Sequence, residues 1–175
     1  MRKMALALAF VGASAWAHEH SIGDITGKDI DLKIGDHAVA GAIKDAIVFG
    51  DMSREGSTLT LKVDGQLVVS AFVREGATFA GTIRSEVQGV ARETRIEFVG
   101  IDQVERTITM KANGSPFTVT IAAEKYESNH FIDPVYSTKI NGEKIEFAVK
   151  GSQACYGFST HLIFMVVGAY IHGSH

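Results

Sequence analysis

The sequence predicts an all-β protein, a single-domain antiparallel β-sandwich or barrel of roughly nine or ten short strands, preceded by a cleaved signal peptide. Three observations support this prediction. From Asp24 to Val149, short β-rich segments alternate with turn residues. Dipeptides that favour tight hairpin turns separate several of these segments. The composition, 46% hydrophobic and 21% charged with 2 prolines, is that of a globular domain and not of a disordered stalk.

Residues 1–17 carry the pattern of a secretory signal peptide. A basic start precedes an apolar run over residues 4–13, and the small-residue triplet Ala-Trp-Ala ends the segment at residue 17. We therefore expect one mature domain, residues 18–175, in an exported compartment, either periplasmic or secreted. Its length is usual for a single domain with a sizeable core.

Three hairpins are predicted within this domain. Asp64-Gly65 and Asn141-Gly142 are expected to form two-residue turns, because both dipeptides tolerate the positive φ angles that such turns require. A third turn is expected at Asn113-Gly114-Ser115, with Pro116 placed where no ladder hydrogen bond is needed. The paired segments are residues 58–63 with 66–73, 107–112 with 117–122, and 135–140 with 143–149.

Four further strands complete the prediction. They are residues 30–34, 46–49, 78–83 and 95–99. One segment before the C-terminal region, residues 39–47, has the spacing of an amphipathic helix, although its glycine and alanine content weakens that interpretation.

The C-terminal segment, residues 161–172, fits two interpretations. Its β-branched residues and central Gly168 favour a buried strand, which we prefer, whereas the hydroxyl residues before it and the glycine after it suit a helix. His161 and Met165 lie on the same side in either case, because residues four apart share a face. The apolar run within it, residues 162–171, is about half the roughly twenty residues of a membrane-spanning helix. The mature chain is therefore predicted to have no transmembrane segment.

The new N-terminus is the first candidate metal site. Cleavage after residue 17 would place a free α-amine beside the imidazoles of His18 and His20. Nitrogen ligands of this kind suit Cu(II), Ni(II) or Zn(II), and we expect copper ahead of the other two. The alternative is a solvated tail, since histidines near chain ends commonly have no further role.

A second candidate site is the pattern Cys155-x5-His161-x3-Met165 near the C-terminus. Thiolate, imidazole and thioether are the ligand set of a blue copper centre. On these residues the chain resembles the cupredoxin family, whose Cys, His and Met ligands lie on a loop before the final strand. The resemblance implies a further upstream histidine, for which His37 and His130 are available. The alternative is that Cys155 and Met165 are buried apolar residues and His161 is a hydrogen-bonded core residue.

These observations predict an exported soluble binding protein, with a transition metal as the first ligand and copper as the favoured ion. The alternatives are a non-catalytic barrel that binds an apolar small molecule, or a cell-envelope structural protein with a protein partner. Enzyme motifs are missing, so an enzyme is disfavoured, and any active site is expected around His130, Asp133 and His161. Acidic residues outnumber basic ones 20 to 17 without a basic cluster, which argues against nucleic acid as a partner.

Overall fold

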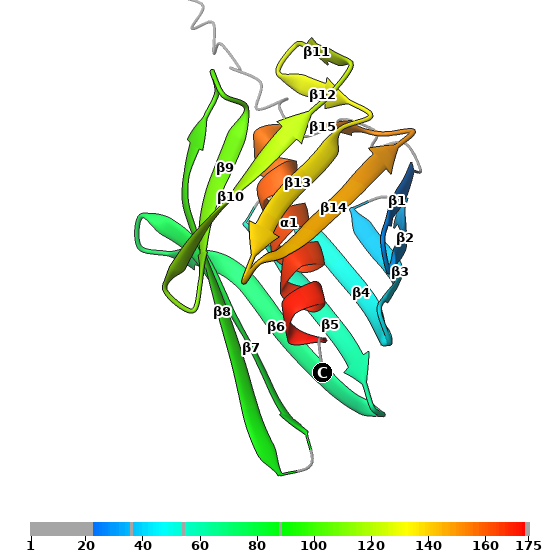
Figure 1. Cartoon of the computed structure of the whole chain (residues 1–175), viewed down its shortest axis with the longest axis vertical. Coiled ribbons are helices and arrows are strands. Elements are labelled where there is room, and N and C mark those ends of the chain that lie inside the picture. Colours follow the sequence, from blue (N-terminus) through cyan, green and yellow to red (C-terminus); the bar gives the residue numbers. More distant parts are fainter. Residues whose placement is uncertain (1–22, 36, 54, 88, 174–175) are drawn as a thin grey trace, which may run out of the picture.

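A computed structural model describes residues 23–35, 37–53, 55–87 and 89–173. In this part of the chain, twelve antiparallel strands form a closed barrel in the order β1-β14-β13-β10-β9-β8-β7-β6-β5-β4-β3-β2 (Figure 1). Neighbours in the barrel are also neighbours along the chain, except at two places. The short strands β11 and β12 intervene between β10 and β13, and β1 pairs with β14 to close the barrel.

The bounds of the elements are as follows. The barrel strands are β1 (Gly23–Gly27), β2 (Ile30–Gly35), β3 (Ala38–Ile43), β4 (Ala46–Ser53), β5 (Gly56–Val63), β6 (Gln66–Glu75), β7 (Thr78–Val87), β8 (Val90–Asp102), β9 (Thr107–Ala112), β10 (Ser115–Ala122), β13 (Val135–Ile140) and β14 (Glu143–Lys150). A small sheet contains β11 (Lys125–Glu127), β12 (His130–Ile132) and β15 (Gln153–Ala154), and the chain then enters α1 (Tyr156–His172).

The strands have the alternating pattern expected of a barrel wall. Along β4, buried and exposed residues alternate over the whole strand, because successive side chains point to opposite faces. The turns follow from local chemistry: Asp64-Gly65 and Asn141-Gly142 both adopt positive φ angles, as two-residue hairpin turns require. The three predicted hairpins are confirmed.

The helix α1 runs through the middle of the barrel (Figure 1). Its residues from Phe158 to Tyr170 are all buried, so the helix is apolar on every side, as a fully enclosed helix must be. A barrel of twelve strands is wider than the roughly eight-stranded barrels that wall side chains alone can fill. The apolar side chains of α1 supply the missing volume, which gives the protein a single core shared by helix and wall.

Two wall glycines allow α1 to approach closely. A Cβ built on Gly50 would lie 2.2 Å from Met165 Sδ, and one built on Gly81 would lie 2.6 Å from an atom of the Phe164 ring. Phe164 in turn stacks on Phe72, with the ring centroids 4.5 Å apart. The helix is therefore held against β4 on one side and against β6 and β7 on another.

The structure corrects several predictions. The all-β class is confirmed, with a closed barrel and one C-terminal helix, but the barrel has twelve strands where nine or ten were predicted. Residues 39–47 are wrong as a helix, since they belong to β3, the turn at Lys44 and β4. Residues 161–172 are wrong as a strand, because they lie in α1, where enclosure by the barrel offsets the weak helix preference of β-branched residues. The predicted signal peptide, residues 1–17, lies outside the described residues.

Candidate functional site

Cys155 occupies the N-cap of α1. Its backbone is extended (φ −86°, ψ 170°), and its Sγ accepts a hydrogen bond from the Phe158 N–H at 3.4 Å. The sulfur thus satisfies one of the backbone donors that a helix leaves unpaired at its start. The structure gives Cys155 the role of a helix cap.

His161 lies inside the barrel and is only 5% exposed. Its Nδ1 and the Ser57 Oγ on β5 are hydrogen-bonded at 3.2 Å. The edges of its ring meet Phe72 and Phe79 in T-shaped contacts with centroid distances of 5.5 and 5.4 Å. Burial lowers the pKa of His161 from 6.5 to about 4, because the apolar surroundings disfavour the imidazolium. This histidine is a neutral core residue.

The predicted ligands of the C-terminal site are therefore distributed along α1. Met165 packs against Gly50 on β4, whereas His161 faces Ser57 on β5. The six residue steps from Cys155 to His161 correspond to a rise of about 9 Å along the helix, whereas the ligands of one ion must all lie within bonding distance of it. Among the described residues, no cluster of three or more His, Cys, Asp or Glu side chains is suited to a metal ion. His18 and His20 lie outside the described residues.

The other predicted histidines lie in the loops and the small sheet. His37 has a positive φ of 63° in the turn between β2 and β3. His130 begins β12, where its Nδ1 is hydrogen-bonded to the Ser128 carbonyl at 2.8 Å. Asp133 accepts a hydrogen bond from the Gly151 N–H outside the barrel, whereas His161 is enclosed, so these residues do not share a pocket.

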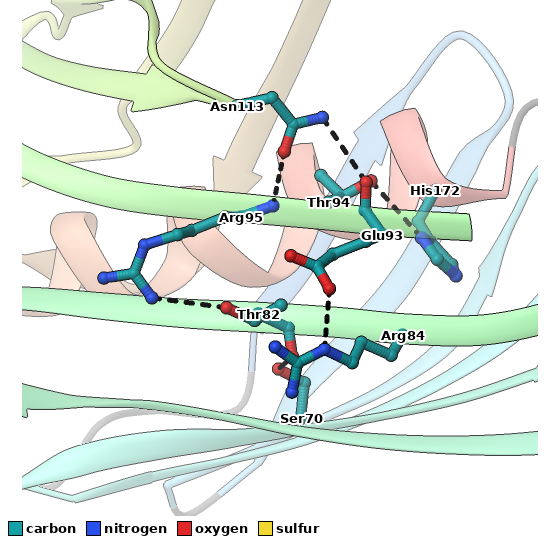
Figure 2. Close-up of polar contacts among 8 residues, drawn as sticks. All are labelled: Ser70, Thr82, Arg84, Glu93, Thr94, Arg95, Asn113 and His172. Atoms are coloured by element: carbon teal, nitrogen blue, oxygen red, sulfur yellow. Dashed lines mark hydrogen bonds and ion pairs between the residues drawn. The ribbon is translucent and has the colours of Figure 1, made fainter. Parts of the chain in front are cut away.

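A second serine–histidine pair lies at the C-terminal end of α1. The Oγ of Ser85 on β7 is 2.7 Å from Nε2 of His172, and the Oγ1 of Thr94 on β8 is 3.3 Å from Nδ1 of the same ring. Figure 2 shows Thr94 directed from β8 toward His172. Arg92 also donates a hydrogen bond from Nη1 to the His172 carbonyl at 3.3 Å. Burial, together with the charge of Arg92, lowers the pKa of His172, so its ring is held neutral.

The two serine–histidine pairs differ in exposure. Ser57 is 4% exposed and lies within the core, whereas Ser85 is partly exposed and lies near the end of β7. The β7–β8 hairpin extends beyond the rest of the barrel (Figure 1). Sequence analysis could not find the second pair, because Ser85 and His172 are separated by 87 positions and belong to no local motif.

The outer face of β4 and β6 carries four exposed apolar side chains. Ile47 and Phe49 on β4, and Leu67 and Val69 on β6, are 50–66% exposed. The strand register brings them together through β5, since Lys62 lies between Ile47 and Leu67, and Thr60 lies between Phe49 and Val69. We refer to these four apolar residues as the outer patch. Their exposed area is on the order of 400 Å², a size that is often functional in monomers.

Comparisons with protein families, with curated proteins and with solved structures found no match. The function must therefore be argued from the geometry itself. Among the described residues, no helix combines the length and the apolar character that crossing a bilayer requires.

Proposed function

We propose that the protein is an exported binding protein whose partner, another protein, docks on the outer patch. The observation that carries this proposal is that four exposed apolar residues flank β5 in register on the outer wall of the barrel, Ile47 and Phe49 on β4 and Leu67 and Val69 on β6. The neighbouring strand β3 presents Ala40 and Ala42 beside them, and such small side chains allow close approach of a partner backbone. Contiguous apolar surface of this size on a folded protein marks interaction sites.

The charge of Lys62, which lies between residues of the outer patch, indicates the kind of partner. Lys62 is exposed and lies in register between Ile47 and Leu67, so any occupant of the patch must cover an ammonium group. A second copy docked about a two-fold axis through this point would bring two Lys62 ammonium groups together, which is unfavourable. If a lipid membrane covered the patch, the Lys62 ammonium group would lie close to the acyl chains, where a charged side chain has a high free-energy cost. A protein surface that is apolar and carries one carboxylate opposite Lys62 satisfies both requirements.

The barrel interior favours this proposal over storage of an apolar small molecule. The side chains of α1 occupy the space that such a ligand would need, and the Gly50 and Gly81 contacts show that helix and wall are in close contact there. The apolar segment 162–171, which would have formed a docking surface if it were exposed, is buried against the wall. The outer patch therefore remains the surface on which the proposal depends.

A photo-crosslinking experiment tests the proposal. A benzophenone amino acid replaces Val69 in the full chain expressed in its source cells, and a matched variant carries it at Thr118, an exposed position on the polar outer face of β10. We expect one discrete protein adduct from position 69 and none from position 118. Adducts of the chain with itself, with lipid, or with the same proteins from both positions would overturn the proposal.

The identified partner then allows a charge exchange. Lys62→Glu is expected to weaken binding by tenfold or more, and changing the facing carboxylate of the partner to lysine is expected to restore it. Binding that is indifferent to both changes would contradict the pairing of Lys62 with a carboxylate.

A further inference from the structure

We propose that Ser85 is a nucleophile that His172 activates for the hydrolysis of small carboxylic esters, at the end of the barrel where α1 terminates. This proposal is independent of the outer patch, which lies on other strands. It rests on one short contact, the 2.7 Å between Ser85 Oγ and His172 Nε2, and on the partial exposure of Ser85. A hydroxyl within hydrogen-bond reach of a neutral imidazole is the arrangement that nucleophilic catalysis requires.

Three elements fix the geometry of this pair. Ser85 comes from β7, His172 is the last residue of α1, and Thr94 comes from β8. The proposal assigns to His172 the tautomer in which Nδ1–H donates to the Thr94 hydroxyl, which leaves the lone pair of Nε2 to accept from the Ser85 hydroxyl. Thr94 and His172 are 5% and 3% exposed, so both are fixed by packing, whereas Ser85 is partly exposed. Thr94 is thus a positioning residue in the place where serine hydrolases have a carboxylate.

The charges around the pair suit the charge changes of acyl transfer. His172 lies at the C-terminal end of α1, where the helix dipole favours a cation and so partly opposes the effects of burial and of Arg92 on the imidazolium formed during the reaction. Arg92 lies directly opposite Ser85 in the register of β7 and β8, and its guanidinium has five N–H donors. One of these donates to the His172 carbonyl, so the guanidinium lies near the residue that contacts Ser85, and the proposal assigns it to the oxyanion that develops there.

The reaction balances with water as the only co-reactant. Ser85 Oγ bonds to the acyl carbon while its proton passes to His172 Nε2. The carbon–oxygen bond to the alcohol then breaks, and the alcohol leaves with that proton. Water adds to the acyl-serine by the same route, releasing a carboxylic acid and restoring Ser85. We assign small esters as the substrate class because Ser85 is only partly exposed.

The chain contains its own control for this proposal. Ser57 and His161 form a similar pair with a 3.2 Å contact, but Ser57 is 4% exposed and enclosed by the core. If a serine–histidine contact alone caused reactivity, both serines would react. If access from solvent is also required, only Ser85 reacts.

The test uses a fluorophosphonate probe and p-nitrophenyl acetate with the purified full chain. We expect covalent labelling at Ser85 and ester hydrolysis that rises with pH as His172 loses its proton. Ser85→Ala should abolish the label and lower the hydrolysis rate at least tenfold, whereas Ser57→Ala should retain both. Thr94→Val should leave the protein folded and shift the pH profile, because it changes the tautomer preference of His172 without removing the nucleophile.

Ser85→Cys keeps the test valid if Ser85→Ala fails to fold. The new thiol would lie against His172 and is expected to react with iodoacetamide faster than Cys155 does. A folded wild-type chain that takes no label, a label on Ser57, or hydrolysis unchanged in Ser85→Ala would each overturn the proposal.

Discussion

The close contact between Met165 of α1 and Gly50 of β4 allows a test of how the helix packs inside the barrel. A Cβ at position 50 would lie 2.2 Å from Met165 Sδ, whereas ordinary contact begins at 3.4 Å, so the sulfur would have to retreat by about 1.2 Å. Met165 is fully buried and has little room to move. Overpacking of this kind costs about 1–3 kcal/mol, so Gly50→Ala should lower the free energy of unfolding by that amount.

Substitution of Met165, the residue that contacts position 50, destabilises the protein by the opposite effect, a loss of packing. Met165→Ala removes the obstructing side chain and leaves a cavity, which should cost about 2–5 kcal/mol. In the double variant, the new methyl group at position 50 enters the space that Met165 has left. The combined loss should therefore be smaller than the sum of the two single losses by about 1 kcal/mol or more.

Urea unfolding followed by far-UV circular dichroism measures all four proteins. Each variant should keep the m-value of the wild type, because the surface exposed on unfolding is nearly unchanged. Gly35→Ala is the matched control, since a Cβ there meets nothing within 4 Å. An unaltered stability of Gly50→Ala, or strict additivity in the double variant, would refute the position assigned to α1.

Three further outcomes are expected. The contribution of His161 to the free energy of unfolding should fall by about 3 kcal/mol as the pH drops from 6.5 to about 4, because the unfolded chain binds a proton that buried His161 does not. In urea titrations at each pH, His161→Gln should remove this contribution and leave the slope due to His172, whose pKa is also lowered. Cys155→Ser should raise the same free energy by about 0.5 kcal/mol, since a hydroxyl oxygen is a better N-cap acceptor than a thiol, and a lower urea midpoint would contradict the capping role. We propose that Cu(II) binds at His18 and His20. Calorimetric titration of a chain that begins at His18 should show tight binding that the double alanine variant loses and Cys155→Ser keeps, and a blue colour that depends on Cys155 would instead support the C-terminal site.

The turns could be predicted from the sequence because their chemistry is local. Asn141-Gly142 and Asp64-Gly65 adopt positive φ angles whatever surrounds them, so the hairpins follow from the dipeptides alone. The strand β3 was missed because its outward residues are alanines and one of its inward positions is Gly41, so polar and apolar residues do not alternate along it. Its place in the wall depends on pairing with β2 and β4, which is a property of the assembled barrel.

The helix and the candidate sites could not be predicted for a different reason. Residues 161–172 are rich in β-branched residues, and only enclosure by a barrel makes an all-round apolar helix favourable there. The hydrogen-bond partners of the two helix histidines also depend on that enclosure. Once α1 is inside, His161 meets Ser57 at one level and His172 meets Ser85 at another, across sequence separations of 104 and 87 positions.

The axial position of α1 also couples the core to the proposed nucleophile. His172 follows Met165 by seven helical positions, so a shift of the helix by one residue, about 1.5 Å, would break the 2.7 Å contact with Ser85. Two packing contacts fix the axial position of α1, that of Met165 with Gly50 and that of Phe164 with Gly81. Gly50→Ala should therefore slow labelling of Ser85 severalfold under conditions in which the variant remains folded by circular dichroism, while Gly35→Ala leaves the rate unchanged. Equal labelling rates in the two folded variants would show that the contact of Ser85 with His172 does not depend on the packing of Met165 against Gly50.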